Sequence, residues 1–396
     1  MDDNLDAFTA YRRVEADIDL DAARYNIEKV IEKNPVSSLV CLVIKADAYG
    51  HGAVEYAREF NDLANYFAVA TMDEAVELRN AGIELPILIL GYTDKCDYKR
   101  AIDYRIRIAM YNLQEAEELS EIAIKNGKKA LVHIKVDSGM SRIGLQCNEA
   151  GVEEAYKIYN LEGLDAEGIF THYAKADYFD KSDAARQYEA FSWFTSQLKE
   201  RGADIRLKHI DNSAGAMEIH SNGFDMMRLG IVIYGLYPSE EIDKSIDLKP
   251  VMSLKSHVIH VKTLEAGRGV GYGWSYVTTK PTRVATVSVG YADGYPRALS
   301  NKGRVLIHGK YAPIIGRVCM DQIMVDVTDI ETETFEVKVG DQVVLFGSQG
   351  QNIISVEEVA EPANSFNYEA VCNISRRVPR VYYKDGEICN VVNYLV

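Results

Sequence analysis

Short apolar runs alternate with longer amphipathic segments between residues 38 and 240. The runs have the length and continuous apolar character of buried parallel strands. The segments between them space their apolar positions near 3.6 residues and often end close to a glycine, as helices do. Eight runs are of the strand kind: 38–45, 66–70, 86–90, 105–110, 130–136, 166–172, 206–211 and 227–235.

Repeats of this kind predict a parallel (β/α)8 TIM barrel. The alternative is an open, doubly wound sheet, which is weaker because no GxGxxG turn follows the first run. After Pro250 the runs become short, rich in β-formers and punctuated by glycine and by turn pairs such as His308-Gly309 and Asp385-Gly386. The sequence therefore predicts an α/β fold, with a barrel over residues 14–240 and a mainly β C-terminal domain over 241–396. The run VEADIDL, near the N-terminus, suits either domain.

Composition and charge exclude some classes of binding partner. Asp and Glu number 59 against 44 Lys and Arg, a net charge of −15 that argues against nucleic acid or an anionic membrane surface as partner. The six cysteines form no CxxC pair, so we expect no metal site of the zinc-knuckle kind. The N-terminus has no apolar signal core, and no stretch approaches the ~20 apolar residues of a spanning helix. We therefore expect a cytoplasmic protein with no membrane segment in this chain.

Candidate chemistry is sought at the strand ends, because barrel enzymes place their active sites there. Lys45 ends the first run, where a buried ammonium is costly unless it is paired or its pKa is lowered. A lysine of lowered pKa suits Schiff-base chemistry. Tyr49 and Gly50 add a hydroxyl and a tight turn close by. His172 ends the sixth run, and Arg142 follows the fifth.

A phosphate site is expected after the last two strands, where barrels often bind phosphate. The seventh run leads into Asp211-Asn212-Ser213, and the eighth holds Arg228-Leu229-Gly230-Ile231. The Ser213 hydroxyl and the backbone N–H groups of Gly230 and Ile231 could supply donors. The competing P-loop pattern GxxxxGK[ST] is absent from the sequence.

These motifs together resemble one known family. The segment VIKADAYGHG is similar to the cofactor-lysine signature of alanine racemases, which depend on pyridoxal 5′-phosphate (PLP) and combine a barrel with a β domain. The same order continues through KVDSGMSRIG, IFTHYAKAD, DNSAGA, MRLGIVIYG, VGYG, SVGYADGYPR, GRVCMDQIMVDVT and RRVPRVY. The resemblance covers nearly the whole chain.

The resemblance implies a role for each candidate residue. Lys45 would carry PLP as a Schiff base and act as one acid/base on the α-carbon. Tyr272 would be the base on the opposite face and would come from the second subunit of a homodimer. Arg142 would contact the cofactor and the substrate carboxylate region, and Met320 of the partner subunit would offer a backbone N–H to that carboxylate. The remaining contacts to the cofactor would come from Tyr49, Asn212, Ser213, Gly230 and Ile231 near the phosphate, and from His172 and Arg228 near the pyridine ring.

These implied roles are chemically consistent with racemisation. A proton leaves one face of the α-carbon and another returns to the opposite face, so one base is needed on each side. Arg228 beside the pyridine nitrogen would not readily protonate it, because a guanidinium has a pKa above ~12. The cofactor would then be a weaker electron sink, and we infer that this suppresses transamination.

Two positions bear on modification and substrate. Lys135 matches a lysine that is carbamylated in some family members, which would make it an anion that orients Arg142. Arg376 stands where well-studied members often carry tyrosine, which puts the outer pocket and the exact substrate in doubt. A cation there should disfavour basic amino acids. We expect the small amino acid alanine as substrate, with D-alanine supplied for peptidoglycan.

Three other functions stay open at this point. One is a serine racemase of the same family, possible also as a domain of a membrane-anchored resistance protein. Another is a non-catalytic PLP-binding protein, although such proteins resemble the barrel alone. A PLP decarboxylase of basic amino acids is a third, but it would present a carboxylate, rather than Arg228, to the pyridine nitrogen.

Overall fold

The computed structural model describes residues 13–35, 38–220, 223–332 and 334–396, and the expectation of an N-terminus without a signal core falls mostly outside them. The chain divides into two compact units. The barrel unit comprises Ala23–Ala48 and Ala53–Lys249. The β unit comprises the described part of Met1–Ala22, Tyr49–Gly52 and Pro250–Val396. Among helices in the described ranges, none has both the length and the apolar character that a bilayer crossing needs.

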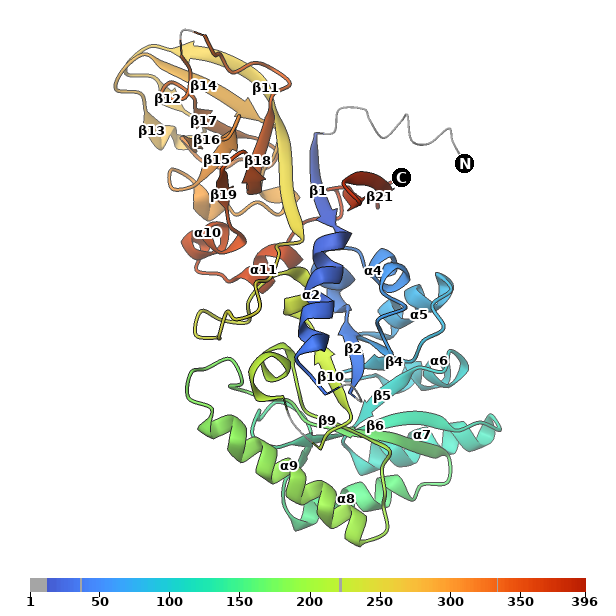
Figure 1. Ribbon diagram of the computed structural model, residues 1–396. Coiled ribbons are helices and arrows are strands. Elements are labelled where there is room, and N and C mark those ends of the chain that lie inside the picture. The colour runs from blue at the N-terminus through green and yellow to red at the C-terminus, as the bar shows by residue number, and fades with distance from the viewer. Residues whose placement is uncertain (1–12, 36–37, 221–222, 333) are drawn as a thin grey trace. The chain divides into compact units, whose positions relative to one another are not determined.

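The barrel unit confirms the predicted fold (Figure 1). From β2 to β9 each strand of the ring pairs in parallel with the next, and β10 pairs in parallel with β2. Between β9 and β10 the ring is drawn together by backbone hydrogen bonds from Asp225 N to Lys208 O (2.7 Å) and from Arg228 N to Asp211 O (3.1 Å). The strands of the ring in the described chain are β2 (Leu39–Val43), β3 (Tyr66–Val69), β4 (Ile87–Ile89), β5 (Arg107–Met110), β6 (Ala130–Asp137), β8 (Leu164–Phe170), β9 (Leu207–His209) and β10 (Met226–Leu229).

Several of the barrel helices start at residues whose side chains cap them. Asn112 and Asn148 accept hydrogen bonds from backbone N–H groups at the starts of α7 and α8. Thr71 and Glu74 form a reciprocal capping box on α5, and one such cap stabilises a helix by about 1 kcal/mol. The helices are α2 (Leu20–Glu32), α3 (Lys45–Tyr49), α4 (Ala53–Glu59), α5 (Met72–Asn80), α6 (Tyr98–Asp103), α7 (Leu113–Lys125), α8 (Glu149–Tyr159) and α9 (Ser182–Glu200).

The inside of the barrel is polar along one face of β6. His133, Lys135 and Asp137 alternate with valine and isoleucine, and all three are buried. Alternate residues of a strand point to opposite faces, so these three side chains share one face. Buried polar groups of this kind need partners, and their hydrogen bonds are described with the site below.

The β unit is built around one long strand, β11 (Met252–Leu264). Its first half pairs with β1 (Val14–Asp19) and β18 (Gln342–Gln349), its second half pairs with β14 (Thr282–Val287), and its register shifts between Val258 and His260. The run VEADIDL thus lies mainly in β1, a strand of this unit. The remaining elements are β12 (Gly269–Val270), β13 (Tyr276–Val277), β15 (Arg304–Ile307), β16 (Lys310–Pro313), β17 (Ile323–Asp326), β19 (Asn352–Ile354), α10 (Val356–Ala360), α11 (Asn367–Cys372), β20 (Arg380–Lys384) and β21 (Glu387–Val392).

Both turn pairs singled out in the sequence close β-hairpins. His308-Gly309 joins β15 to β16, and Asp385-Gly386 joins β20 to β21. All four residues have φ between 50° and 78°. A two-residue hairpin turn needs positive φ at both positions to match the twist of the strands, and Asp-Gly satisfies this at low cost.

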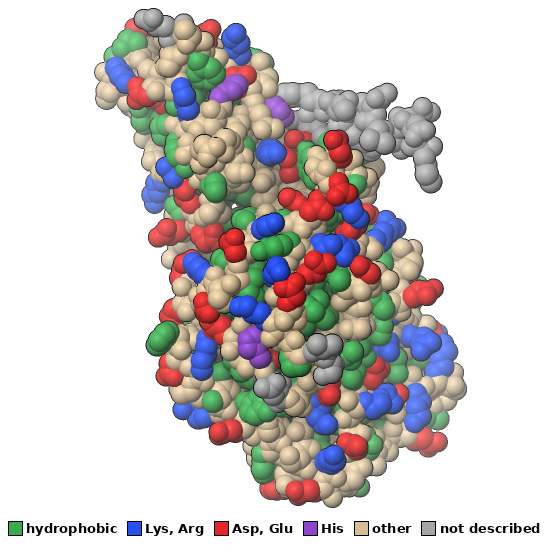
Figure 2. Space-filling model, viewed as in Figure 1, with side chains coloured by type: hydrophobic (Ala, Val, Ile, Leu, Met, Phe, Trp, Pro, Cys, Tyr) green, Lys and Arg blue, Asp and Glu red, His purple; other side chains and the backbone are tan. Residues whose placement is uncertain are grey.

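The molecular surface carries charges of both signs. On the face shown in Figure 2, Lys and Arg side chains are interspersed with Asp and Glu. Many are paired across elements, as Arg201 is with Glu149 (2.7 Å) and Glu153 (3.2 Å). Exposed pairs of this kind contribute little to stability.

Candidate active site

Lys45 stands at the carboxyl end of β2 and opens a turn of left-handed helix. The residues after it, Ala46–Tyr49, have φ between 51° and 54°. Left-handed helix costs an L-residue about 1–2 kcal/mol. A turn of four such residues persists only where its surroundings hold it in place.

Three hydrogen bonds within the barrel unit hold this turn. Ala46 N donates to Glu74 Oε1 (2.7 Å), and Ala53 N donates to Asp47 Oδ1 (2.8 Å). Ala48 N donates to the carbonyl oxygen of Ile44, the residue just before Lys45 (2.9 Å). The backbone on each side of Lys45 is therefore fixed by hydrogen bonds.

Arg228 lies fully inside the barrel at the end of β10. Its Nη2 donates to the carbonyl oxygens of Thr171 (2.8 Å) and Ile210 (2.9 Å), and its Nη1 donates to His209 Nδ1 (2.8 Å). Burial lowers the pKa of Arg228 to about 10, so the guanidinium stays charged at neutral pH. It lies 3.3 Å from Nδ1 of His172.

The hydrogen bond from Arg228 fixes the protonation of two buried histidines. A guanidinium only donates, so Nδ1 of His209 is an acceptor and its proton sits on Nε2. That Nε2 faces Nδ1 of His133 at 2.9 Å and donates to it. Burial lowers the pKa of His133 to about 3, and Gly168 makes room for its ring, because a Cβ there would lie 2.4 Å from Nδ1.

Four predicted site residues of the barrel unit are near enough to His172 for their charges to affect its pKa. The pKa of His172 is well below its usual value, first because the ring is buried and then because Arg228, Arg142, Lys135 and Lys45 add positive charge around it. A neutral imidazole here can accept a hydrogen bond from Arg228. The structure thus brings these five predicted residues to one region at the carboxyl ends of the strands.

Lys135, one of these five residues, is almost completely buried. Its Nζ donates to the carbonyl oxygen of Val136 (2.7 Å) and lies 5.3 Å from the centre of the Phe170 ring. Burial, followed by repulsion from Arg228, lowers the pKa of Lys135 to about 7. A large share of this amine is therefore unprotonated, and nucleophilic, at neutral pH.

Arg142 is exposed and follows a loop that is anchored on Asp137. The Oδ1 of Asp137 accepts from Gly139 N and Ser141 N, each over 3.0 Å. Gly144 packs against the backbone of β6, where a Cβ would lie 2.6 Å from Asp137 N. The loop that presents Arg142 is thus fixed at both of its ends.

The expected phosphate residues of the barrel unit meet after β9 and β10. Gly230 N donates to Ser213 Oγ (2.9 Å), which leaves the Ser213 hydroxyl proton to point at a ligand. Ile231 begins the short helix η3 (Ile231–Tyr234), and the first N–H groups of a helix have no partner inside it. Asn212 does a structural task, because its side chain accepts from Gly215 N and donates to Tyr173 O. The Ser213 hydroxyl and the Ile231 N–H are donors that fit a phosphate, whereas the Gly230 N–H is used to hold Ser213.

Three predicted site residues belong to the β unit. Tyr272 lies in the turn between β12 and β13, flanked by Gly271 and Gly273 with φ of 68° and 67°, and 71% of its side chain is exposed. Met320 is also exposed, at 52%. Tyr49 is buried, and burial raises its pKa.

The Met320 loop is held by hydrogen bonds around a buried aspartate. Tyr291 N and Ala292 N donate to the carbonyl oxygens of Cys319 and Met320, each over 3.0 Å. Asp293, fully buried, accepts from Gly290 N (2.9 Å) and pairs with the guanidinium groups of two arginines, Arg13 and Arg377. The backbone of Met320 is therefore positioned by a network that extends well beyond its own loop.

Arg376 is engaged within the β unit. Its guanidinium lies 5.4 Å from the centre of the Tyr394 ring, a cation–π distance. The sequence singled out Arg376 because it stands where well-studied family members often carry tyrosine. In the structure the side chain is exposed and lies beside this aromatic ring.

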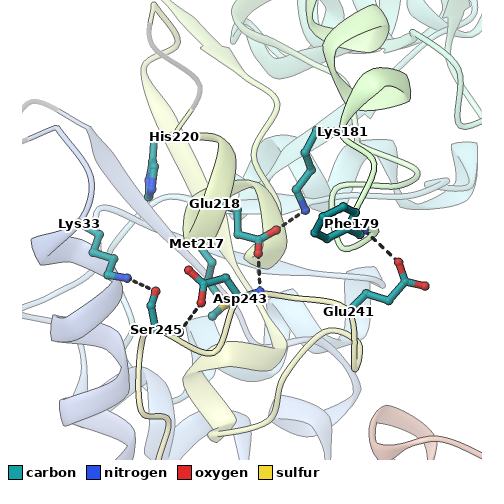
Figure 3. Close-up of a pocket in the computed structure, with 9 residues that line it drawn as sticks. All are labelled: Lys33, Phe179, Lys181, Met217, Glu218, His220, Glu241, Asp243 and Ser245. Carbon is teal, nitrogen blue, oxygen red and sulfur yellow. Dashed lines mark hydrogen bonds and ion pairs between the residues drawn. The ribbon is translucent and has the colours of Figure 1, made fainter.

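A polar cavity elsewhere in the barrel unit contains none of the predicted residues (Figure 3). It has a volume of about 510 Å³, and its charged side chains bond to one another, to a hydroxyl or to backbone N–H groups. Lys181 pairs with Glu218, and Lys33 donates to Ser245 Oγ (2.5 Å).

Sequence reasoning missed several residues that shape the site. Glu74, which binds the turn after Lys45, reads in the sequence only as a helix-capping residue. His209 gave a weak signal, as a histidine at the end of a predicted strand. Asp293 lies inside the quoted motif SVGYADGYPR, but nothing in its spacing points to the Met320 loop.

Comparison with known proteins places the chain among racemases. Residues 18–238 match the family described as "Alanine racemase, N-terminal domain", and residues 251–382 match "Alanine racemase, C-terminal domain". The chain is 43% identical to alanine racemase 1 of Clostridium acetobutylicum over 390 residues, which cover 98% of this chain and 100% of that protein.

Solved structures give the same result. An alanine racemase of Clostridium difficile 630 superposes with a TM-score of 0.92 at 42% identity, covering 97% of this chain and 99% of that one. An alanine racemase of Bartonella henselae, described with covalently bound pyridoxal phosphate, superposes with a TM-score of 0.82 at 28% identity, covering 94% and 100%.

Proposed function

This chain belongs to the alanine racemase family and is an amino-acid racemase, and from that premise we propose that it interconverts L- and D-alanine by a two-base mechanism. Lys45 and Tyr272 would be the two bases. The observation that carries the proposal is the grouping of Lys45 with Arg228, His172 and Arg142 at one end of the barrel.

The cofactor would be pyridoxal 5′-phosphate, as the family and the Bartonella structure suggest. When bound, it draws electrons from the substrate's α-carbon and so acidifies the hydrogen there. Lys45 would hold it covalently, and Arg228, charged and braced by two carbonyls, would contact the ring nitrogen. His172 would pack beside the ring. The Ser213 hydroxyl, the Ile231 N–H and Tyr49 would hold the phosphate, and Asn212 and Gly230 would fix Ser213 and its loop in place.

The protein residues would then manage the protons. Lys45 would exchange a proton with one face of the α-carbon and the Tyr272 hydroxyl with the other. A free tyrosine has a pKa of about 10, so its hydroxyl acts as a base at neutral pH only beside positive charge, which Arg142 would supply for Tyr272. Arg142 and the backbone N–H of Met320 would orient the substrate carboxylate.

A homodimer is part of the proposal. Tyr272, Trp274 and Met320 are large apolar or aromatic side chains that lie exposed on the β unit at 71%, 72% and 52%. Exposed apolar side chains that lie together often mark an interface. A second copy of the chain would cover this surface and receive Tyr272 and Met320 into its own barrel.

Lys135 would carry a carbamate. The unprotonated amine, abundant because the pKa is about 7, would attack carbon dioxide, form an N–C bond and release one proton. The product is an anion that could pair with Arg142. Protein grown and kept in ¹³C-bicarbonate should show a carbamate carbon resonance that is missing from Lys135→Met. A bare amine at Lys135 in a high-resolution crystal structure would refute the modification.

Racemisation assays test the central proposal. We expect turnover of L- and D-alanine with a higher kcat/KM than for L- and D-serine. The enzyme would act in the cytoplasm and supply D-alanine for peptidoglycan. Lys45→Ala should lose the visible absorbance of lysine-bound cofactor. Tyr272→Phe should keep that absorbance and lose turnover. A higher kcat/KM for serine would overturn the choice of alanine.

A further inference from the structure

Glu74 receives three backbone N–H groups on one carboxylate. Its Oε1 accepts from Ala46 N (2.7 Å), and its Oε2 accepts from Ala70 N (2.7 Å) and Thr71 N (3.1 Å). Ala46 follows Lys45 directly, whereas Ala70 and Thr71 follow β3. One side chain therefore links the ends of two neighbouring barrel strands.

Helix capping accounts for only part of this geometry. The bonds that Thr71 N donates to Glu74, and Glu74 N donates to Thr71 Oγ1 (3.3 Å), form an ordinary capping box on α5. The bond to Ala46 lies outside α5 and reaches a residue 28 positions earlier. It meets the chain where the backbone leaves β2 and turns left-handed. A capping residue alone has no reason to reach that far.

The left-handed turn makes this contact consequential. Positive φ is unfavourable for residues other than glycine, and it is adopted here by Ala46, Asp47 and Ala48. Without supporting contacts, a chain would relax from this conformation to one of lower energy. The Ala46 N–H is the contact nearest to Lys45 on its C-terminal side among those described for the turn. If it were lost, the turn could relax and the Lys45 side chain would leave from a different backbone direction.

We propose that Glu74 is a positioning residue for Lys45, acting through the Ala46 N–H to hold the turn that aims the lysine side chain. This inference rests on the proposed cofactor-attachment role of Lys45. A carboxylate suits the task because it offers two oxygens to three donors, and a charged acceptor makes stronger hydrogen bonds than a neutral one.

The test compares Glu74→Ala and Glu74→Gln with two controls on the same helix. Thr71→Ala removes the cap hydroxyl, and Asp73→Asn removes a neighbouring first-turn carboxylate that pairs with Arg100 at the surface. For holoenzyme of Glu74→Ala we expect kcat to fall roughly 10- to 100-fold with little change in KM, as misplacement of a reacting group does. Glu74→Gln, which keeps one carbonyl acceptor, should lie between Glu74→Ala and wild type and serves if Glu74→Ala does not fold.

A second readout does not depend on turnover. Amide hydrogen exchange of peptides covering residues 44–50 should be faster in both Glu74 variants, with or without cofactor, and unchanged in Thr71→Ala and Asp73→Asn. Equal losses of kcat in Glu74→Ala and Thr71→Ala, or unchanged exchange in residues 44–50, would overturn the proposal. If wild type failed to racemise alanine, the proposed function would fall, while the exchange data would still decide whether Glu74 holds the turn.

Discussion

Nη1 of Arg228 donates to Nδ1 of His209 over 2.8 Å, and this one bond sets the direction of the hydrogen-bond chain behind it. Because the guanidinium cannot accept, the proton of His209 is forced onto Nε2, which points at His133. The charge proposed to face the cofactor ring is thus supported by a neutral, directionally fixed pair of histidines.

Arg228→Met should destabilise the protein strongly. The change leaves the carbonyls of Thr171 and Ile210 and the Nδ1 of His209 without their buried donor, at about 1–3 kcal/mol for each unsatisfied group. We expect the free energy of unfolding in urea to fall by at least about 3 kcal/mol. The pKa of His172 should rise, because Arg228 is the largest source of positive charge near it, which NMR titration would detect. A loss below about 1 kcal/mol would show that the bonds matter little.

His133 should make the protein acid-sensitive. Burial, then repulsion from Arg107 and Arg228, lowers its folded pKa to about 3, whereas an unfolded histidine titrates near ~6.5. Between these values the unfolded chain binds the additional proton, so stability falls as pH falls from about 6.5 towards 3. His133→Gln should reduce the slope of unfolding free energy against pH there by up to about 1.4 kcal/mol per unit. Exposed His260→Gln is the control, and an equal slope change in both variants would contradict the assignment.

Mixing two inactive variants tests whether active sites are shared between subunits. Lys45→Ala and Tyr272→Phe should each be inactive alone. If Tyr272 serves the partner's Lys45, random mixed dimers contain one site with both lesions and one intact site. Refolded equimolar mixtures should then regain roughly a quarter of wild-type activity, since half of the dimers are mixed. No recovery, with mixed dimers shown by native mass spectrometry, would place both residues in one subunit's site.

Gly290→Ala should disturb substrate binding through Met320. A Cβ at Gly290 would lie 2.3 Å from the carbonyl oxygens of both Cys319 and Met320, and such backbone atoms can yield only if the loop moves. We expect KM for alanine to rise roughly tenfold, equivalent to about 1.4 kcal/mol of binding energy. Gly91→Ala, where the added carbon meets nothing within 4 Å, should leave KM unchanged. A normal KM in Gly290→Ala would argue against a binding role for the Met320 loop.

Most of the fold could be predicted from the sequence because the patterns that specify it are local. Most barrel strands are short, largely apolar runs, and both hairpin turns are residue pairs in which the second residue is a glycine, which tolerates positive φ. Lys45 and His172 could be picked out because a polar residue at the end of an apolar run is conspicuous, and Arg228 because it is a charged residue inside the eighth run. The structure then places them close together.

The supports of the site were not readable, because they depend on pairings across the fold. Glu74 reaches Ala46 across 28 residues, and Asp293 reaches Arg13 across 280. The left-handed turn after Lys45 carries no glycine before residue 50, so composition gives no sign of it. Such partners follow only from the register of neighbouring strands and the length of a side chain.

The strand β1 is synthesised before the strands with which it pairs. This strand leaves the ribosome well before its partners β11, which starts at Met252, and β20, which starts at Arg380. The barrel can form while both edges of β1 are still unpaired, since domains generally fold as units during synthesis. Until β11 has been made, Val14–Asp19 is therefore an open strand that could pair with another chain, and its three acidic residues provide charge that discourages such pairing.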